Sequence, residues 1–189
     1  MKRIAFCLAL MWFSRLMVQA QVQVMGSART INGQLEIWQN GQKLKPALST
    51  KIMVYCLGDR LSFDSTAIEL QLTSNHDKML RVYLIYYDVD EKAAGKRSME
   101  TGKPYSIPIT HEEPDTKEYI CLLYSTETID VKRIVDAMNE TKGTLFQKME
   151  LALNGKMVPK EDLRFVMNEI EFSARTDKTV VPIIIEIVH

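Results

Sequence analysis

The chain has 189 residues, with 24 basic and 24 acidic side chains, and 46% of its residues are hydrophobic. This charge balance argues against a nucleic-acid-binding surface, which needs clustered lysine and arginine, and against an acidic tail. The length is sufficient for one domain with a substantial hydrophobic core.

Residues 1–20 have the pattern of an export signal. A basic start precedes the apolar stretch Ile4–Phe13, and the small residues Val18 and Ala20 follow as a signal-peptidase site. We therefore expect cleavage after Ala20, export to the periplasm or the medium, and one β-rich domain over residues 21–189. The alternative is an uncleaved anchor, although a spanning helix needs roughly 20 apolar residues. No later stretch is long and apolar enough to span a membrane.

The first part of the mature chain predicts a succession of strands. The segment Gln34–Trp38 alternates polar and apolar residues, and Asn40-Gly41 favours a hairpin turn. Asp88, Asp90, Glu91 and the Ala-Gly-Lys-Arg segment at 94–97 are expected to form an exposed loop. Further strands are expected at Ile52–Leu57, Leu61–Phe63, Ile68–Leu72, Leu80–Val89, Tyr105–Ile109 and Glu118–Tyr124.

The apolar residues change to helical spacing between residues 130 and 154. Asp130 is expected to cap the first helix, and Thr144 to open a second one with capping-box spacing. The sequence then predicts a hairpin around Asn168, with a short helix at Pro159 as an alternative, and a buried strand at Val180–Val188. We expect an α+β, mainly β fold: an antiparallel β-sandwich-like domain with an inserted helical pair near residues 130–154.

Two cysteines remain in the mature chain, Cys56 and Cys121. Export would permit a disulfide between them, but both lie in apolar, strand-like segments. Buried free thiols that behave as small hydrophobic groups are the alternative.

The sequence has no recognisable catalytic or metal-binding motif. Nucleophile elbows, phosphate-binding loops and zinc-ligand spacings are absent. The nearest ligand clusters are the acidic residues at 88–91 and His111 with the two glutamates after it, and both are more typical of turns. We therefore predict no catalytic residue, no metal site and no cofactor.

The second helix carries an apolar stripe made of Phe146, Met149 and Leu153. Such a stripe could enter the groove of a partner protein. More often, a stripe of this kind packs on the parent sheet. Both interpretations remain open at this stage.

Several segments resemble a known family. These are GDRLSF at residues 58–63, the polar turn at 74–77, the strand at 82–85 with Asp88 and Asp90 after it, and Tyr105–Ser125. Together they are similar to the bacterial domain-of-unknown-function family 4384. The resemblance implies a β-rich accessory domain, often attached to caspase-like peptidases, and brings no catalytic residues. The peptidase half and its characteristic cysteine segment are absent from this chain.

The expected function is that of an exported, non-catalytic accessory or binding domain of the bacterial cell envelope. Its partner would be a protein of the envelope, and no nucleic acid is expected to bind. One alternative is a structural or assembly component of an envelope or secretion complex. Another is a small hydrolase whose site the sequence does not reveal.

Overall fold

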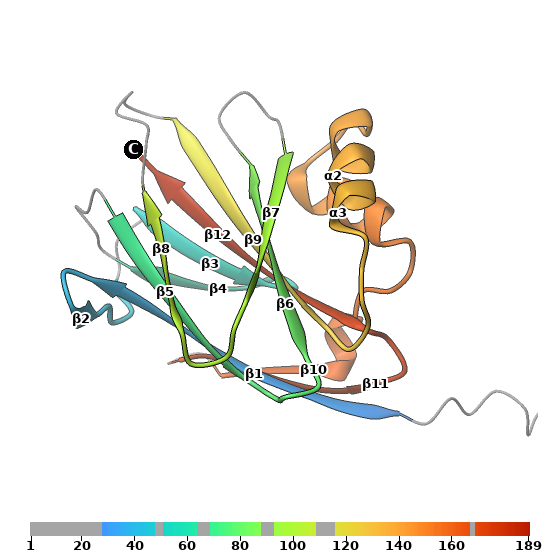
Figure 1. The fold of residues 1–189 in the computed structure, drawn as a ribbon, viewed down its shortest axis with the longest axis horizontal. Coiled ribbons are helices and arrows are strands. Elements are labelled where there is room, and N and C mark those ends of the chain that lie inside the picture. Colours follow the sequence, from blue (N-terminus) through green and yellow to red (C-terminus); the bar gives the residue numbers. More distant parts are fainter. Residues whose placement is uncertain (1–27, 48–50, 64–68, 88–92, 109–115, 167–168) are drawn as a thin grey trace, which may run out of the picture.

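A computed structural model describes residues 28–47, 51–63, 69–87, 93–108, 116–166 and 169–189. In these residues the chain forms two antiparallel sheets that pack together, with two helices on one side (Figure 1). This is the expected α+β, mainly β, sandwich-like fold, with the helical pair where the sequence predicts it. The predicted export signal lies outside the described residues. Within them, no helix is long and apolar enough to cross a membrane.

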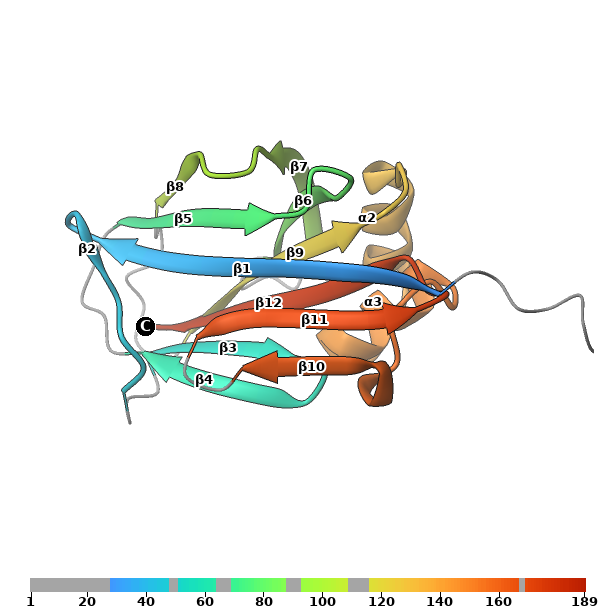
Figure 2. The same cartoon turned by 90° about the horizontal axis from the view of Figure 1, so that it is seen from below.

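Sheet A has the strand order β10-β11-β1-β5-β8, and the short strand β2 pairs with the end of β1. In Figure 2, β5, β1, β11 and β10 lie side by side. Asn40 and Gly41 join β1 to β2 with φ values of 49° and 75°, as a tight hairpin turn requires. The strands are β1 (Arg29–Gln39), β2 (Gln42–Lys43), β5 (Glu69–His76), β8 (Pro104–Pro108), β10 (Leu163–Val166) and β11 (Ile170–Thr176).

Sheet B has the order β4-β3-β12-β9-β6-β7, so the last strand of the chain lies between β3 and β9. Almost every residue of β12 and β9 is buried, because sheet A covers one face and the helices cover part of the other. The strands are β3 (Ile52–Cys56), β4 (Asp59–Phe63), β6 (Arg81–Tyr87), β7 (Ala93–Met99), β9 (Lys117–Ser125) and β12 (Val180–Val188).

The helical pair consists of α2 (Val131–Glu140) and α3 (Leu145–Leu153). The Asp130 side chain accepts a hydrogen bond from the backbone of Arg133, and Thr144 and Gln147 form a complete capping box. A short 3-10 helix, η1 (Lys160–Asp162), follows and leads into the hairpin of β10 and β11. Both helix starts are therefore at the residues that the sequence indicates.

The core has two parts, one on each face of sheet B. Between the sheets, the aromatic rings of Tyr124 and Phe172 meet edge to face with centroids 4.8 Å apart. Gly33 of β1 makes room for them, because a Cβ atom there would lie 2.5 Å from the Phe172 ring. Under the helices, a second cluster joins Cys121 and Leu123 to the buried faces of α2 and α3.

One sequence-based expectation is wrong. Residues 93–97 belong to the strand β7, whereas we expected an exposed loop at 88–97; residues 88–92 lie outside the described residues. β7 pairs with β6 through an irregular register between Leu84 and Ile85, and it is the outermost strand of sheet B. Pairing with β6 overrides the weak strand propensity of this small and charged segment, and charged residues are common on edge strands.

Candidate functional site

The face of sheet B that points away from sheet A, here called the outer face, is only partly covered. Along β12, Pro182, Ile184 and Glu186 share this face because side chains alternate along a strand. Ile184 lies opposite Tyr55 of β3, and Glu186 lies opposite Tyr119 of β9. The helical pair packs toward β6 and β7, which leaves the β3 and β12 side of the face open.

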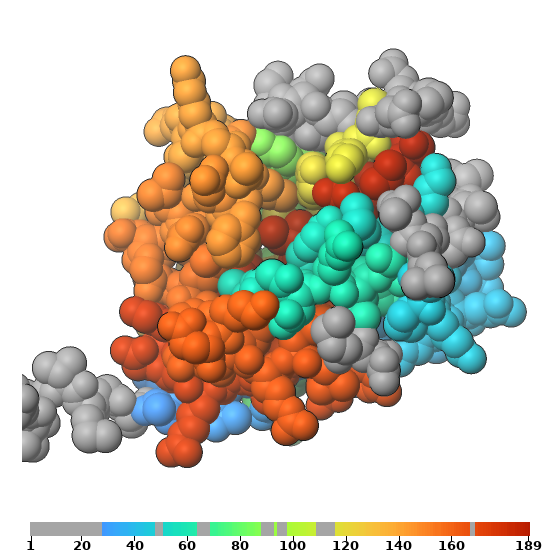
Figure 3. All heavy atoms as spheres, turned by 180° about the vertical axis from the view of Figure 1, so that it is seen from behind, coloured from blue at the N-terminus to red at the C-terminus, as the bar shows by residue number. Residues whose placement is uncertain are grey.

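A cleft of about 480 Å³ occupies this open area, and we call it the α3 cleft. Viewed from behind, red atoms of β12 are visible in a hollow between the orange helices and the teal strands β3 and β4 (Figure 3). Its lining is mainly apolar and aromatic. The lining residues include Tyr55, Tyr119, Leu145, Phe146, Ile184 and Glu186.

The charged group of the α3 cleft is Glu186, whose side chain is 8% exposed. Its Oε1 atom lies 3.2 Å from Nζ of Lys117, which is 48% exposed. Glu186 also accepts a hydrogen bond from the Tyr119 hydroxyl. The carboxylate is therefore held in place, with one cationic partner on the solvent side.

The two phenols of the α3 cleft are poor acids. Burial, with Glu186 nearby, raises the pKa of Tyr119 to about 12 and also raises the pKa of Tyr55. Both hydroxyl groups therefore remain protonated at neutral pH. The Tyr119 proton is already donated to Glu186 and the Tyr55 proton to Met53 Sδ at 3.3 Å, so the two residues offer a ligand their ring surfaces and are unsuited to taking a proton from a substrate.

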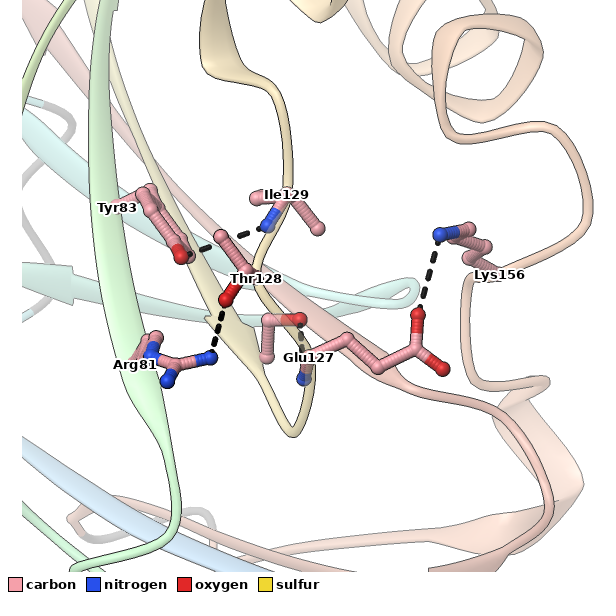
Figure 4. A network of polar contacts seen from close by, with 7 residues as sticks. Arg81, Tyr83, Glu127, Thr128, Ile129 and Lys156 are labelled. Atoms are coloured by element: carbon pink, nitrogen blue, oxygen red, sulfur yellow. Dashed lines mark hydrogen bonds and ion pairs between the residues drawn. The ribbon is translucent and has the colours of Figure 1, made fainter.

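A polar network fixes the loop that leads into the helical pair (Figure 4). Arg81 of β6 donates to the Thr128 hydroxyl, and the backbone N–H of Ile129 donates to the Tyr83 hydroxyl at 3.4 Å. Lys156, just after α3, pairs with Glu127 at 3.1 Å. The network ties the loop before α2 to β6 and to the end of α3.

The predicted stripe of the second helix is divided by the structure. Met149 and Leu153 are buried and pack in the cluster under the helices. Phe146 is 38% exposed and lines the α3 cleft. Of the three residues, only Phe146 is accessible to a ligand.

The structure does not bring the two cysteines together. Both are free and buried. Cys56 of β3 faces sheet A, whereas Cys121 of β9 faces the helices, and β12 lies between their strands. A disulfide needs Cα atoms within about 7 Å and converging side chains. Burial raises the pKa of each thiol to about 12, which makes both poor nucleophiles.

A serine and a histidine do meet inside the sandwich. Ser74 Oγ lies 2.9 Å from Nδ1 of His76 and 3.0 Å from the Tyr124 hydroxyl. Ser74 is fully buried, so its hydroxyl cannot reach a substrate and serves to satisfy the buried phenol.

Within the described ranges, no group of three or more histidine, cysteine or acidic side chains is placed to hold a metal ion. His189 Nε2 lies 3.5 Å from the buried carboxylate of Glu118. The acidic residues at 88–91 and the cluster at 111–113 lie outside the described residues.

Sequence reasoning missed the three residues that define the α3 cleft: Tyr55, Tyr119 and Glu186. A signal was available, because Pro182 and Glu186 interrupt an otherwise apolar strand and share one face. The sequence does not show that β12 pairs with β3 and β9, because these strands are distant from it in the chain, and so the neighbours of Glu186 could not be predicted.

The chain has no match among family models, among curated proteins or among solved structures.

Proposed function

We propose that this protein is an exported, non-catalytic binding domain whose ligand occupies the α3 cleft. The observation that carries the proposal is this cleft itself, with its aromatic and apolar lining on a sheet that is otherwise covered. Concave, mostly apolar sites with a few polar groups are typical of ligand binding.

The chemistry of the described groups supports binding over catalysis. The phenols in the α3 cleft are protonated, and the carboxylate of Glu186 is already paired with Lys117. The two thiols and the Ser74 hydroxyl are buried away from it. A hydrolase would need an accessible nucleophile beside a base, and these groups do not provide one.

The cellular setting belongs to the same proposal. The pattern of residues 1–20 favours export, and the resemblance of GDRLSF and the later segments favours an accessory domain of the bacterial envelope. Cell fractionation with N-terminal sequencing tests this: we expect the protein in the envelope or medium, starting at Gln21. Recovery from the cytoplasm with an intact first residue would overturn the export part.

Binding is tested by protein-observed NMR of the exported protein with neutral indole and naphthalene fragments. We expect shift changes at Tyr55, Tyr119 and Phe146. Phe146→Ala removes part of the wall and should weaken these changes. Leu151→Ala is the matched control, because Leu151 is a 65% exposed apolar residue of the same helix and lies outside the α3 cleft. Shift changes confined to other surfaces, or unaffected by Phe146→Ala, would contradict the proposal.

A further inference from the structure

Glu186 is an unusual residue for its position. It belongs to a central strand in which the neighbouring side chains are apolar, and its own side chain is 8% exposed. Burying a carboxylate costs free energy unless cations and hydrogen-bond donors compensate for the lost water. The acidic group at this point gives the α3 cleft a fixed, buried carboxylate.

The partners of Glu186 leave room for a further donor. Lys117 contacts Oε1, and Tyr119 supplies one hydroxyl. An ionised carboxylate can accept about four hydrogen bonds, so these two partners do not saturate it. Lys117 is half exposed, so its ammonium regains water when it leaves, and an incoming cation can then compensate the buried carboxylate in its place. The site already holds a side-chain cation, and that cation can be exchanged.

The surroundings of Glu186 suit a flat organic cation. Tyr55, Tyr119 and Phe146 line the same cleft and offer aromatic rings, which attract cations over their faces. Leu145 and Ile184 provide apolar surface for the methylene groups that carry such a cation. A guanidinium group is planar, weakly hydrated and able to contact both carboxylate oxygens, so it fits better than an ammonium group.

From this geometry we infer that the α3 cleft binds an arginine side chain of a partner protein, with the guanidinium on Glu186 in place of Lys117. The inference rests on the proposed function and names its ligand. The hollow in Figure 3 is open to the surface. An open hollow suits a side chain that enters from a segment lying outside it, whereas sites for free small molecules usually enclose most of the ligand.

The first experiment compares capped Gly-Arg-Gly and Gly-citrulline-Gly peptides by NMR titration of the exported protein. Citrulline has the shape of arginine without its charge. We expect the arginine peptide to shift Tyr55 and Tyr119 and to bind about tenfold more tightly than the citrulline peptide. Equal affinities, or no binding of the arginine peptide, would overturn the inference. Free arginine binding as well as the peptide would also overturn it, because the ligand would then be a small molecule.

The second experiment changes the two charges in opposite directions. Glu186→Gln should weaken binding of the arginine peptide about tenfold, because the carboxylate is lost. Lys117→Met should strengthen it about threefold, because the resident competitor is removed. The matched control is Lys43→Met in sheet A, which should leave binding unchanged, since Lys43 is 44% exposed and pairs with Glu36 at 2.7 Å outside the α3 cleft.

The sign of the Lys117→Met effect is decisive. Weaker binding would mean that Lys117 itself contacts the ligand, and unchanged binding would mean that it does not compete; either result overturns the inference. The NMR spectra report at the same time whether each variant is folded. If neutral fragments bind in the α3 cleft but the arginine peptide does not, the proposed function stands and this inference fails.

Discussion

The two faces of sheet B are built from the same strands but are covered differently. The inner face packs against sheet A, and its residues on β12, from Val181 to Ile187, are almost completely buried. The outer face is covered by α2 and α3 over β6, β7 and parts of β9 and β12, whereas Tyr55 and Tyr119 remain partly exposed. The comparison shows that the extent of the helical layer determines which part of the outer face is accessible to solvent.

The largest expected effect is in thiol reactivity, and the order in which the two thiols become reactive separates the two faces. Cys56 lies on the inner face and Cys121 on the outer face, and each has its pKa raised by burial from 9.0 to about 12. Iodoacetamide should modify both about a thousandfold more slowly than in the unfolded chain, because the thiolate is the reactive form. In mild denaturant, Cys121 should react before Cys56, since the helical layer can open locally.

Mass spectrometry of the modified protein under non-reducing conditions measures both rates. If Cys56 and Cys121 are modified at equal rates at every denaturant concentration, the helices and the two sheets unfold together, and the two faces of sheet B do not differ in local stability. A mass corresponding to a disulfide would contradict the free thiols.

Core truncations test the same comparison through stability. Ile185→Ala on the inner face should lower the free energy of unfolding by about 4 kcal/mol, because both sheets hold the cavity open. Met149→Ala under the helices should cost about 2 kcal/mol, because a helix can shift to fill part of the space. Leu151→Ala, at an exposed position of α3, is the control and should change the free energy by less than about 0.5 kcal/mol. Urea unfolding measures all three variants. An equal loss of free energy in Ile185→Ala and Met149→Ala would mean that the helices do not shift to fill the space left by Met149.

A smaller effect is expected from the cap of α3. Thr144→Ala removes the side chain that accepts from the Gln147 backbone and should cost about 1 kcal/mol. Thr144→Ser should retain most of the stability, because serine can form the same bond. Thermal unfolding followed by circular dichroism measures both variants. No difference between them would mean that the capping box does not hold this end of the α3 cleft.

The smallest expected effect is the pH dependence that His76 confers. Burial holds the pKa of His76 below its usual 6.5, an effect that Asp77 partly offsets. The unfolded chain therefore binds more protons between the two pKa values. Stability from this group is complete above pH 6.5 and decreases as the pH falls toward the pKa of the folded state. His76→Gln should reduce the change in the free energy of unfolding with pH in this range. Urea unfolding at pH 5 to 8, a range of about three units around the imidazole pKa, measures it. If the free energy of unfolding of His76→Gln depends on pH as steeply as that of the unchanged protein, the pH dependence comes from other groups.

Much of the fold could be predicted from the sequence because its signals are local. Alternation places the strands β1, β4 and β5, the turn at Asn40-Gly41 follows from residues that tolerate positive φ, and the capping residues locate both helices. β7 could not be predicted in this way. Its residues lack strand character, and it forms because β6 offers an unpaired edge.

The candidate site was less predictable than the fold. Phe146 was singled out by its helical spacing, but the same spacing also selected Met149 and Leu153, which are buried. Helical periodicity identifies a face of a helix and does not say where the sheet beneath it ends. That limit is set by strand order, because β3 and the Glu186 end of β12 lie beyond β6 and β7, the strands on which α2 packs.

The sequence by itself determined the mainly β composition, the positions of the helices and the apolar character of Val180–Val188, because propensity, alternation and capping act over a few residues. Only the tertiary structure decided that this last strand lies between β3 and β9. That placement brings Tyr55, Tyr119 and Glu186 together from segments far apart in the chain. It depends on long-range pairing, which no local pattern encodes, and it creates the α3 cleft.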